Sequence, residues 1–330
     1  MSALVEISAL AVDYRVGERQ VRALDGVDLV VEAQQSLGIV GESGSGKSTL
    51  GLAFGRLLPP NATVSEGELL LGGRSVLAYR PAELRAFRRD QLGFVFQSPA
   101  AALDPTRRIH KQLRDVLDTP RSDRGSLLRL LTRVGFPDPE AVAGSFPHEL
   151  SGGMAQRVVV ALAIARGPKL VVADEPTASL DSSVRNQVLD VLFGLPDEIG
   201  AALVILTHDL RTVASRCSRV AVMYGGRVVE SGTRERVLGS PRHPYTAGLL
   251  AATPGDDRGD EELVAIAGVP PVLRGRVEAC AYAARCPLAT PVCFETRPEA
   301  REVDERTVIC HHAEQLRSGG SGLVEASAAR

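Results

Sequence analysis

The stretch Gly41-Glu42-Ser43-Gly44-Ser45-Gly46-Lys47-Ser48-Thr49 is the starting point for interpreting the whole sequence. It follows an apolar run at residues 37–40 and precedes residues 50–54, which we expect to form a helix. A G-x-x-x-x-G-K-[ST] pattern between a strand and a helix is typical of a loop that cradles phosphate groups. Its glycines let backbone N–H groups turn toward an anion, and the helix N-terminus adds a partial positive charge. The stretch therefore predicts binding of a nucleoside triphosphate.

Two side chains of this loop have predicted contacts with the nucleotide. Lys47 would reach the β- and γ-phosphates, and the Ser48 hydroxyl would ligate Mg²⁺. The sequence has only three lysines and uses arginine at its other basic positions. It thus keeps a compact ammonium group where a point charge suits a phosphate better than a planar guanidinium does. The alternative is an ordinary glycine turn before a helix, and the flanking strand and helix patterns argue against it.

The composition is that of a globular protein with room for about two domains. The 330 residues are 44% hydrophobic and 24% charged, and the formal net charge is −2. This charge gives no electrostatic reason to expect a nucleic acid partner. The longest apolar run, residues 158–165, is far shorter than the roughly 20 residues that span a bilayer. Because the N-terminus shows no signal-peptide pattern, we expect a cytosolic chain, or one held at a membrane only through partners.

Strand patterns precede the phosphate loop. Residues 4–12 alternate loosely between apolar and polar side chains, and residues 27–31 form a second strand candidate. We expect these strands to form a small sheet beside the nucleotide. Tyr14 follows the first strand, and its ring could stack on a purine base or plug the end of the strand. The residues leave both alternatives open.

Polar side chains follow three predicted core strands. The strands at residues 92–96, 169–173 and 202–206 lead respectively to Gln97, to Asp174 with Glu175, and to Thr207 with His208. Ligands bind at the carboxyl ends of strands in α/β sheets, and two adjacent carboxylates there are costly unless a cation or a reaction uses them. We predict that Asp174 holds Mg²⁺ through water and that Glu175 orients and deprotonates the attacking water. Gln97 would point at the γ-phosphate.

Residues 100–149 differ in composition from their surroundings and lie within a stretch, about residues 98–157, for which we predict a separate subdomain. They are rich in arginine, leucine and aspartate, and they show helical spacing of apolar residues at Leu127, Leu131 and Val134. We predict an inserted helical subdomain here. At its end, Ser151-Gly152-Gly153 begins a long apolar helix that reaches about residue 166. Ser151 could simply cap this helix, or the same geometry could form a second anion site.

In their order and spacing these motifs resemble the nucleotide-binding subunits of ABC transporters, from residue 4 to about residue 240. The resemblance implies an α/β fold of the ABC-type P-loop NTPase class. It consists of a RecA-like core, a small antiparallel sheet, an inserted helical subdomain and a small C-terminal domain. Residues 41–48 resemble the Walker A motif, Gln97 the Q-loop glutamine, residues 150–157 the signature, residues 170–175 Walker B, Ser179–Asp181 the D-loop and His208 the switch histidine.

The same resemblance implies a set of site residues and an assembly. The subunits would form a head-to-tail dimer, in which the signature of one subunit completes the ATP site of the other. The implied catalytic residues are Glu175, His208 and Gln97, and the implied Mg²⁺ ligands are Ser48, Gln97 and Asp174. The implied ATP contacts are Tyr14, Gly41, Glu42, Ser43, Gly44, Ser45, Gly46, Lys47, Ser48, Thr49, Ser151, Gly152, Gly153 and Asp181.

Beyond residue 240 the resemblance narrows to importers of dipeptides, oligopeptides and nickel. It rests on His243-Pro244-Tyr245-Thr246, Gly268-Val269-Pro270-Pro271 and Arg285-Cys286-Pro287. We therefore expect an ABC domain at residues 1–240 and a C-terminal domain at residues 241–330, of which the last dozen residues are polar enough to be disordered.

This narrower resemblance implies an ATPase that energises peptide uptake from the cytoplasmic face of the cell membrane. Its implied partners are a second, related ATPase in a heterodimer, two integral membrane permeases and an extracytoplasmic solute-binding protein. The alternatives are a nickel or other small-solute importer and a soluble ABC ATPase of a phosphonate-degrading enzyme complex. The sequence does not name the transported solute.

Four of the five cysteines lie in the last fifth of the chain, at Cys280, Cys286, Cys293 and Cys310. Structural disulfides are uncommon in cytosolic proteins. The spacing is neither that of a zinc ribbon nor that of a bacterial ferredoxin, yet it supplies four soft ligands within 31 residues. We predict that these thiolates hold a [4Fe–4S] cluster, with zinc as the close alternative and free buried thiols as the other.

Overall fold

The computed structural model describes residues 3–117, 124–178, 180–253 and 265–316. By the density of its contacts the chain divides into two compact units. Unit 1 consists mainly of Ala78–Leu206, and unit 2 of Val5–Val30, Leu37–Leu77 and the chain from Thr207 onward. Ser179 of the predicted D-loop and the last dozen residues, which we expected to be disordered, lie outside the described residues. The domain boundary near residue 240 falls inside unit 2 and stays a prediction.

Unit 1 contains three parallel strands. Strand β6 (Leu92–Val95) pairs with β7 (Leu170–Asp174), and β7 pairs with β8 (Ala202–Thr207). Every residue of β7 and β8 is buried, which fits the continuous apolar runs of strands covered on both faces. Val95 lies opposite Ala173, and Asp174 lies opposite Leu206, so the carboxyl ends of the three strands meet at one edge.

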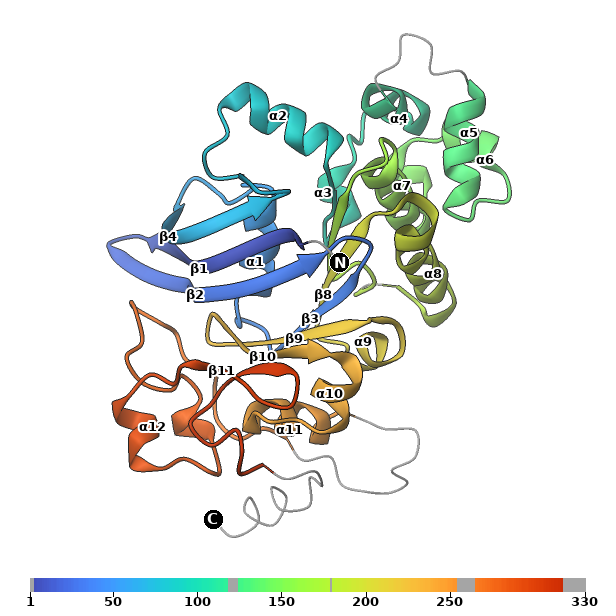
Figure 1. Cartoon of the computed structure of the whole chain (residues 1–330). Coiled ribbons are helices and arrows are strands. Elements are labelled where there is room, and N and C mark those ends of the chain that lie inside the picture. The colour runs from blue at the N-terminus through green and yellow to red at the C-terminus, as the bar shows by residue number, and fades with distance from the viewer. Residues whose placement is uncertain (1–2, 118–123, 179, 254–264, 317–330) are drawn as a thin grey trace. The chain divides into compact units, whose positions relative to one another are not determined.

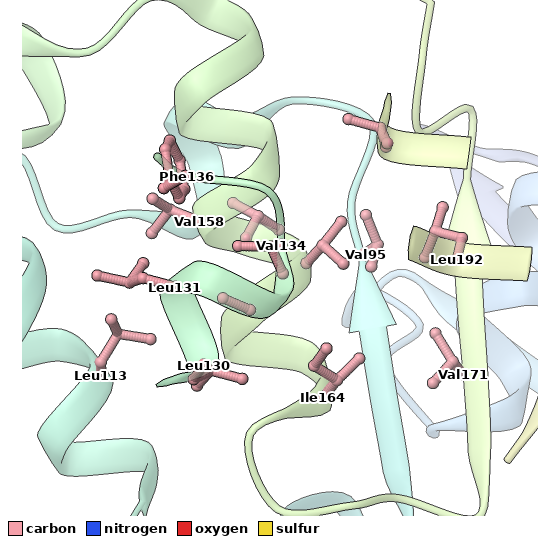
Figure 2. Packing of buried hydrophobic residues seen from close by; sticks show 14 of the residues in the cluster. Val95, Leu113, Leu130, Leu131, Val134, Phe136, Val158, Ile164, Val171 and Leu192 are labelled. Atoms are coloured by element: carbon pink, nitrogen blue, oxygen red, sulfur yellow. The ribbon is translucent and has the colours of Figure 1, made fainter. Parts of the chain in front are cut away.

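The helical part of unit 1 confirms the helices predicted for residues 98–157. Its core joins buried side chains of several helices with those of the strands, among them Leu131, Val134, Phe136, Val158 and Ile164 (Figure 2). The elements are α2 (Pro81–Asp90), α3 (Pro99–Ala102), α4 (Ile109–Leu117), α5 (Arg124–Arg133), α6 (Pro139–Gly144), the 3₁₀ turn η1 (Pro147–Glu149), α7 (Gly152–Ile164) and α8 (Ser182–Ile199).

Unit 2 contains the small antiparallel sheet that the strand patterns predict. Its strand order is β2 (Arg19–Glu32), β1 (Ala3–Val16), β4 (Ala62–Leu71) and β5 (Arg74–Ser75). Both β1 and β2 are longer than predicted, because pairing with a neighbour extends them across polar residues that break the sequence pattern. Figure 1 shows β1, β2 and β4 in blue with helix α1 (Lys47–Phe54) beside them.

The other strands of unit 2 surround the strand that carries the phosphate loop. Strand β3 (Ser36–Val40) pairs in parallel with β9 (Arg219–Tyr224). A tight turn at Gly225 and Gly226, both with positive φ, joins β9 to the antiparallel β10 (Arg227–Thr233). The chain after residue 240 adds β12 (Arg306–Ile309) beside β10 and β11 (Ala300–Glu302) beside β12.

Short helices and loops complete unit 2. They are α9 (Leu210–Arg216), α10 (Arg234–Gly239), α11 (Pro244–Ala251), the 3₁₀ turn η2 (Ala283–Arg285) and α12 (Pro291–Glu295). The C-terminal segment is therefore built onto the same unit as the phosphate loop.

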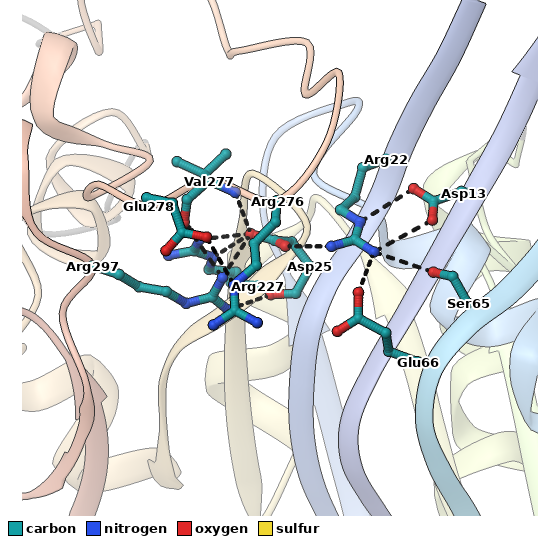
Figure 3. Close-up of polar contacts among 10 residues, drawn as sticks. All are labelled: Asp13, Arg22, Asp25, Ser65, Glu66, Arg227, Arg276, Val277, Glu278 and Arg297. Carbon is teal, nitrogen blue, oxygen red and sulfur yellow. Dashed lines mark hydrogen bonds and ion pairs between the residues drawn. The ribbon is translucent and has the colours of Figure 1, made fainter.

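A chain of charged side chains joins distant parts of unit 2 (Figure 3). Arg22 pairs with Asp13 and with Asp25, and Asp25 in turn accepts hydrogen bonds from Arg227 and Arg297. Because β2, β10 and the C-terminal segment each contribute a partner, this network connects all three. Across the residues that the structure describes, no helix is both long enough and apolar enough to span a bilayer.

Candidate functional site

The phosphate loop connects β3 to α1, and two of its glycines are sterically required. Gly46 has a φ of 104°, a left-handed conformation that favours glycine, and a Cβ there would lie 2.7 Å from the carbonyl oxygen of Ala23. A Cβ on Gly41 would lie 2.2 Å from the carbonyl oxygen of Met223. Among the described residues no side chain caps the N-terminus of α1, so its first N–H groups suit an anion.

Lys47 is held against its own loop. Its ammonium group donates hydrogen bonds to the carbonyl oxygens of Gly41, at 2.7 Å, and Glu42, at 3.0 Å. Its side chain is largely buried. The positive charge therefore lies at the loop whose N–H groups are expected to bind phosphate.

Tyr14 lies beside the helix that follows the phosphate loop. Its hydroxyl group is 3.2 Å from Oγ1 of Thr49, and either atom could donate the proton. The ring is partly exposed. The side chain is thus positioned by α1, and both predicted roles, base stacking and a plug at the strand end, stay open.

Two residues that the sequence analysis did not assign to the site contact the phosphate loop. The hydroxyl of Tyr245 accepts a hydrogen bond from the backbone N–H of Glu42 at 2.8 Å. Arg285 donates to both carboxylate oxygens of Glu42, at 2.6 and 3.0 Å. These partners are 203 and 243 residues from Glu42 along the chain, so no local pattern could have indicated the contacts.

In unit 1, the predicted catalytic residues lie at the carboxyl edge of the parallel strands. Gln97 is exposed two residues after β6, Asp174 is the buried last residue of β7, and Glu175 follows it. Glu175 has a φ of 45°, an uncommon conformation for a residue with a side chain, and its N–H donates to the carbonyl oxygen of Leu206. Such strain concentrates at functional sites.

His208 directly follows β8 and is exposed. The next residue, Asp209, caps the N-terminus of α9 by accepting hydrogen bonds from the N–H groups of Arg211 and Thr212. The position of His208 just beyond a core strand agrees with the prediction from sequence, and its role in the reaction stays a prediction.

The predicted signature begins helix α7. The Ser151 hydroxyl accepts a hydrogen bond from the N–H of Met154 at 3.3 Å, so Ser151 does cap the helix. Ser151 and Gly152 are exposed, whereas Gly153 is buried. A Cβ on Gly153 would lie 2.3 Å from Cγ1 of Val184, but a Cβ on Gly152 would meet nothing within 4 Å. Packing within the chain thus explains Gly153 and leaves Gly152 unexplained.

Asp181 caps the N-terminus of α8 on the surface of unit 1. Its carboxylate accepts hydrogen bonds from the N–H groups of Ser183, at 3.1 Å, and Val184, at 3.0 Å. The hydrogen bond from the Val184 backbone, followed by that from the Ser183 side chain, lowers the pKa of Asp181. The carboxylate is therefore ionised at neutral pH, and it accepts its hydrogen bonds from the first turn of its own helix.

The predicted Mg²⁺ ligands have suitable chemistry. Ser48, Gln97 and Asp174 offer a hydroxyl, an amide and a carboxylate oxygen, the hard donors that Mg²⁺ prefers. Asp174 is buried at a strand end, where a carboxylate needs a compensating charge. The donor set therefore fits the ion in its chemistry.

The four tail cysteines gather in one region of unit 2. The backbone N–H of Cys280 donates a hydrogen bond to the carbonyl oxygen of Cys293 at 2.9 Å. Burial, with a smaller contribution from the neighbouring thiols, raises the pKa of Cys286 to about 12 and that of Cys310 to about 11. The thiols of Cys286 and Cys310 are therefore protonated at neutral pH.

The predicted [4Fe–4S] cluster finds no support in this arrangement. Among the described residues, no group of three or more His, Cys, Asp or Glu side chains is placed to hold a metal ion, which applies equally to zinc. The sulfur atoms have protein partners instead. Sγ of Cys293 lies 3.7 Å from Nε2 of His312, and Sγ of Cys310 accepts a hydrogen bond from the His312 N–H at 3.4 Å.

Comparison with known families identifies two matching regions. Residues 24–178 match the ABC transporter family model, and residues 229–293 match the model of the oligopeptide/dipeptide transporter C-terminal region. The chain is 40% identical over 309 residues to the oligopeptide transport ATP-binding protein OppD of Bacillus subtilis (strain 168), covering 92% of this chain and 86% of that protein. It is 39% identical over 306 residues to the dipeptide transport ATP-binding protein DppD of Lactococcus lactis subsp. cremoris, covering 91% and 88%.

A solved structure confirms the predicted fold class. The ATP-binding cassette MJ0796, in a dimeric post-hydrolysis state bound to ADP and phosphate, matches with a TM-score of 0.63 and 30% sequence identity. The match covers 70% of this chain and 98% of that one. The chain therefore belongs to the ATP-binding subunits of ABC transporters, in the oligopeptide/dipeptide group, and it is an ATPase.

Proposed function

We propose that this chain is the ATP-hydrolysing subunit of an importer for dipeptides or oligopeptides. The observation that carries the proposal is the combination of a phosphate-loop ATPase with a C-terminal region that matches peptide transporters at residues 229–293. Relatives that match over most of their length are named for oligopeptide and dipeptide transport. An ATPase subunit acts through its partners and does not itself bind the solute. The proposed solute class is therefore taken from the names of these relatives.

We assign a role in the chemistry to each of the predicted site residues. The N–H groups of the phosphate loop bind the phosphates, and Lys47 neutralises charge on them. Ser48, Gln97 and Asp174 would hold Mg²⁺, and the bound ion would supply Lewis-acid stabilisation of the phosphate charge. Glu175 accepts the proton of the attacking water, and the strained backbone at this residue supports the assignment. His208 orients the γ-phosphate, and Tyr14 contacts the base.

The proposed assembly is a head-to-tail dimer with a related ATPase, on the cytoplasmic face of the membrane. Exposed Ser151 and Gly152 support it, because Gly152 has open space around it and its own chain does not require a glycine there. With Gly153 and Asp181 they would complete the ATP site of the partner. Two permeases would transmit the motion, and an extracytoplasmic protein would deliver the solute.

Co-expression with candidate permease and solute-binding-protein genes tests this function. We expect the chain to co-purify with integral membrane subunits, and we expect its ATPase rate to rise at least tenfold over that of the isolated chain when a dipeptide-loaded binding protein is added. Stimulation by nickel but not by peptides would assign the alternative cargo. Full activity of a monomeric chain without membrane partners would contradict the importer proposal and favour the soluble ATPase.

We propose, separately, that the four tail cysteines take up a soft metal when their thiols lose their protons. What supports this is the sequence, which places four soft ligands within 31 residues. Thiolates suit both an iron–sulfur cluster and zinc. Anaerobic purification with analysis of iron, acid-labile sulfide and zinc decides between the two. Absence of all three would exclude a metal.

A further inference from the structure

The C-terminal segment contacts the phosphate loop through a forked ion pair. Nη1 and Nη2 of Arg285 donate separately to Oε2 and Oε1 of Glu42, at 2.6 and 3.0 Å. The Arg285 side chain is only 5% exposed and that of Glu42 is 26% exposed, so water screens this pair less than a surface pair. Glu42 is the second residue of the phosphate loop.

Arg285 is fixed from several sides before it reaches Glu42. Its Nε donates to the carbonyl oxygen of Ala267 at 2.7 Å, and Nη2 donates to that of Ile266 at 3.2 Å. Nη1 also lies 3.3 Å from the hydroxyl of Tyr224, a buried residue of β9. The hydrogen bond with Glu42 is the main cause that raises the pKa of Arg285. The guanidinium therefore stays charged and has little freedom to turn away.

The loop that receives Arg285 leaves space for its side chain. Gly268 has a φ of 79°, and a Cβ on it would lie 3.3 Å from Cγ of Arg285. A larger residue at position 268 would strain the backbone and crowd the arginine stem. The path of Arg285 is thus determined by the segment at residues 266–268.

Tyr245 holds the backbone of the same loop residue. Its hydroxyl accepts the hydrogen bond from the Glu42 N–H, and the side chain is completely buried. Its ring packs against those of Tyr224 and Tyr282, with centroids 4.6 and 5.4 Å apart. A hydroxyl at the end of such a packed ring is a rigid acceptor.

Glu42 is therefore held at three places. Its carboxylate binds Arg285, its N–H binds Tyr245, and its carbonyl oxygen accepts a hydrogen bond from Lys47. A carboxylate in an anion-binding loop repels the charge of a triphosphate unless a cation compensates it. Arg285 is the cation that pairs with it.

We propose that Arg285 and Tyr245 are positioning residues for ATP binding, through which the C-terminal segment controls the affinity of the phosphate loop. Arg285 neutralises Glu42 and holds it in place, and Tyr245 sets the start of the loop against β9. The inference rests on the proposed ATP site at this loop. It assigns to the C-terminal segment an effect on ATP binding in addition to any contact with partners.

The test compares five variants of the full-length chain in an equilibrium titration with a fluorescent ATP analogue. Arg285→Ala should weaken ATP binding roughly tenfold, and Arg285→Lys should fall between it and the wild type, because an ammonium group cannot form the fork. Arg276→Ala is the matched control. Arg276 lies in the same segment, is 57% exposed and pairs with Glu278, so its loss should leave ATP binding unchanged. The double variant Arg285→Ala/Glu42→Gln should recover most of the lost affinity, because it removes the uncompensated carboxylate.

Kinetics with the assembled transporter separate positioning from a general loss of structure. For Arg285→Ala the KM for ATP should rise roughly tenfold while kcat changes less than about twofold, and the melting temperature without nucleotide confirms folding. Unchanged ATP affinity in Arg285→Ala, or no recovery in the double variant, would overturn the inference. Lys47→Ala is included because it tests the proposed site itself. If Lys47→Ala binds ATP like the wild type, the proposed function and the inference both fall.

Discussion

Asp25 and Arg227 form an ion pair that is closed to solvent inside unit 2. Nε and Nη2 of Arg227 both donate to Oδ2 of Asp25, at 2.9 and 2.5 Å. The side chain of Arg227 is 2% exposed and that of Asp25 is 1% exposed. The two residues are 202 positions apart, on β2 and β10. Arg297 of the C-terminal segment also donates to Asp25, so one carboxylate joins three parts of the unit (Figure 3).

Replacement of Asp25 by alanine should destabilise the protein strongly. It leaves the guanidinium of Arg227 buried without its partner, which typically costs about 3–5 kcal/mol. Arg276→Ala removes an exposed ion pair with Glu278 and should cost less than about 1 kcal/mol. Denaturant unfolding of both variants measures the difference, and equal stabilities would show that the buried network contributes little.

The Asp25 carboxylate should also make the stability of the folded protein sensitive to acid. Burial alone would raise the pKa of Asp25, but the hydrogen bond and charge of Arg227, with the charge of Arg297, outweigh burial and lower it. Because the folded pKa lies below the unfolded value of about 3.9, the contribution is complete above roughly pH 5 and is lost as the pH falls through the folded pKa. Asp25→Asn should therefore flatten the stability profile below about pH 4, and a profile parallel to that of the wild type would contradict the assignment.

His243 should change the stability of the protein in a higher pH range than Asp25 does. It is buried at the N-terminus of α11, where its Nδ1 accepts the N–H of Tyr245, and burial lowers its pKa to about 3. The unfolded chain binds this proton at about pH 6.5, so below that pH stability should fall by up to about 1.4 kcal/mol per unit until the folded pKa is reached.

His243→Asn isolates this effect, because an asparagine oxygen can accept the same cap bond but does not titrate. The variant should lose less stability than the wild type between pH 6.5 and pH 4 in denaturant unfolding. Comparing the two proteins removes the contribution of other groups, such as the buried Glu230, whose pKa burial raises. Identical slopes would show that His243 is protonated without unfolding.

Glu175→Gln should keep ATP binding and reduce turnover by roughly a hundredfold or more, because the amide preserves the shape but cannot accept a proton. Lys47→Ala should instead weaken nucleotide binding itself. Single-turnover hydrolysis and nucleotide titration on the same preparations separate the two effects. Turnover by Glu175→Gln near the wild-type rate would remove Glu175 from its assigned role.

The two signature glycines offer a matched pair. Gly153→Ala should destabilise the chain by about 1–3 kcal/mol, because its Cβ would lie 2.3 Å from Cγ1 of Val184. Gly152→Val should leave ATP binding by the isolated chain unchanged, since the position has open space, but it should lower the ATPase rate of the assembled dimer. Normal dimer activity in Gly152→Val would argue against a partner's approach at this surface.

The sequence by itself determined the fold class and the sites that depend on local patterns. The phosphate loop, the polar residues after β6, β7 and β8, and the Ser151 cap could be predicted because turn geometry, strand ends and helix caps involve residues within a few positions of each other. Their order and spacing then identified the family, which the comparisons confirmed. The long strands β1 and β2 were underestimated, because pairing between strands and not local pattern extends them.

Only the tertiary structure decided which distant residues meet. Arg285 and Glu42 are 243 positions apart and Asp25 and Arg227 are 202 apart, so each pair arises from how β9, β10 and the C-terminal segment pack within unit 2. The cysteines show the same limit of prediction from sequence. Their spacing supplies four soft ligands, but it does not determine the direction of each sulfur, and among the described residues they do not form a metal-binding group. Chain spacing constrains geometry only over short separations. Over longer ones, the packing of the core and the need to neutralise buried charge determine which side chains are partners.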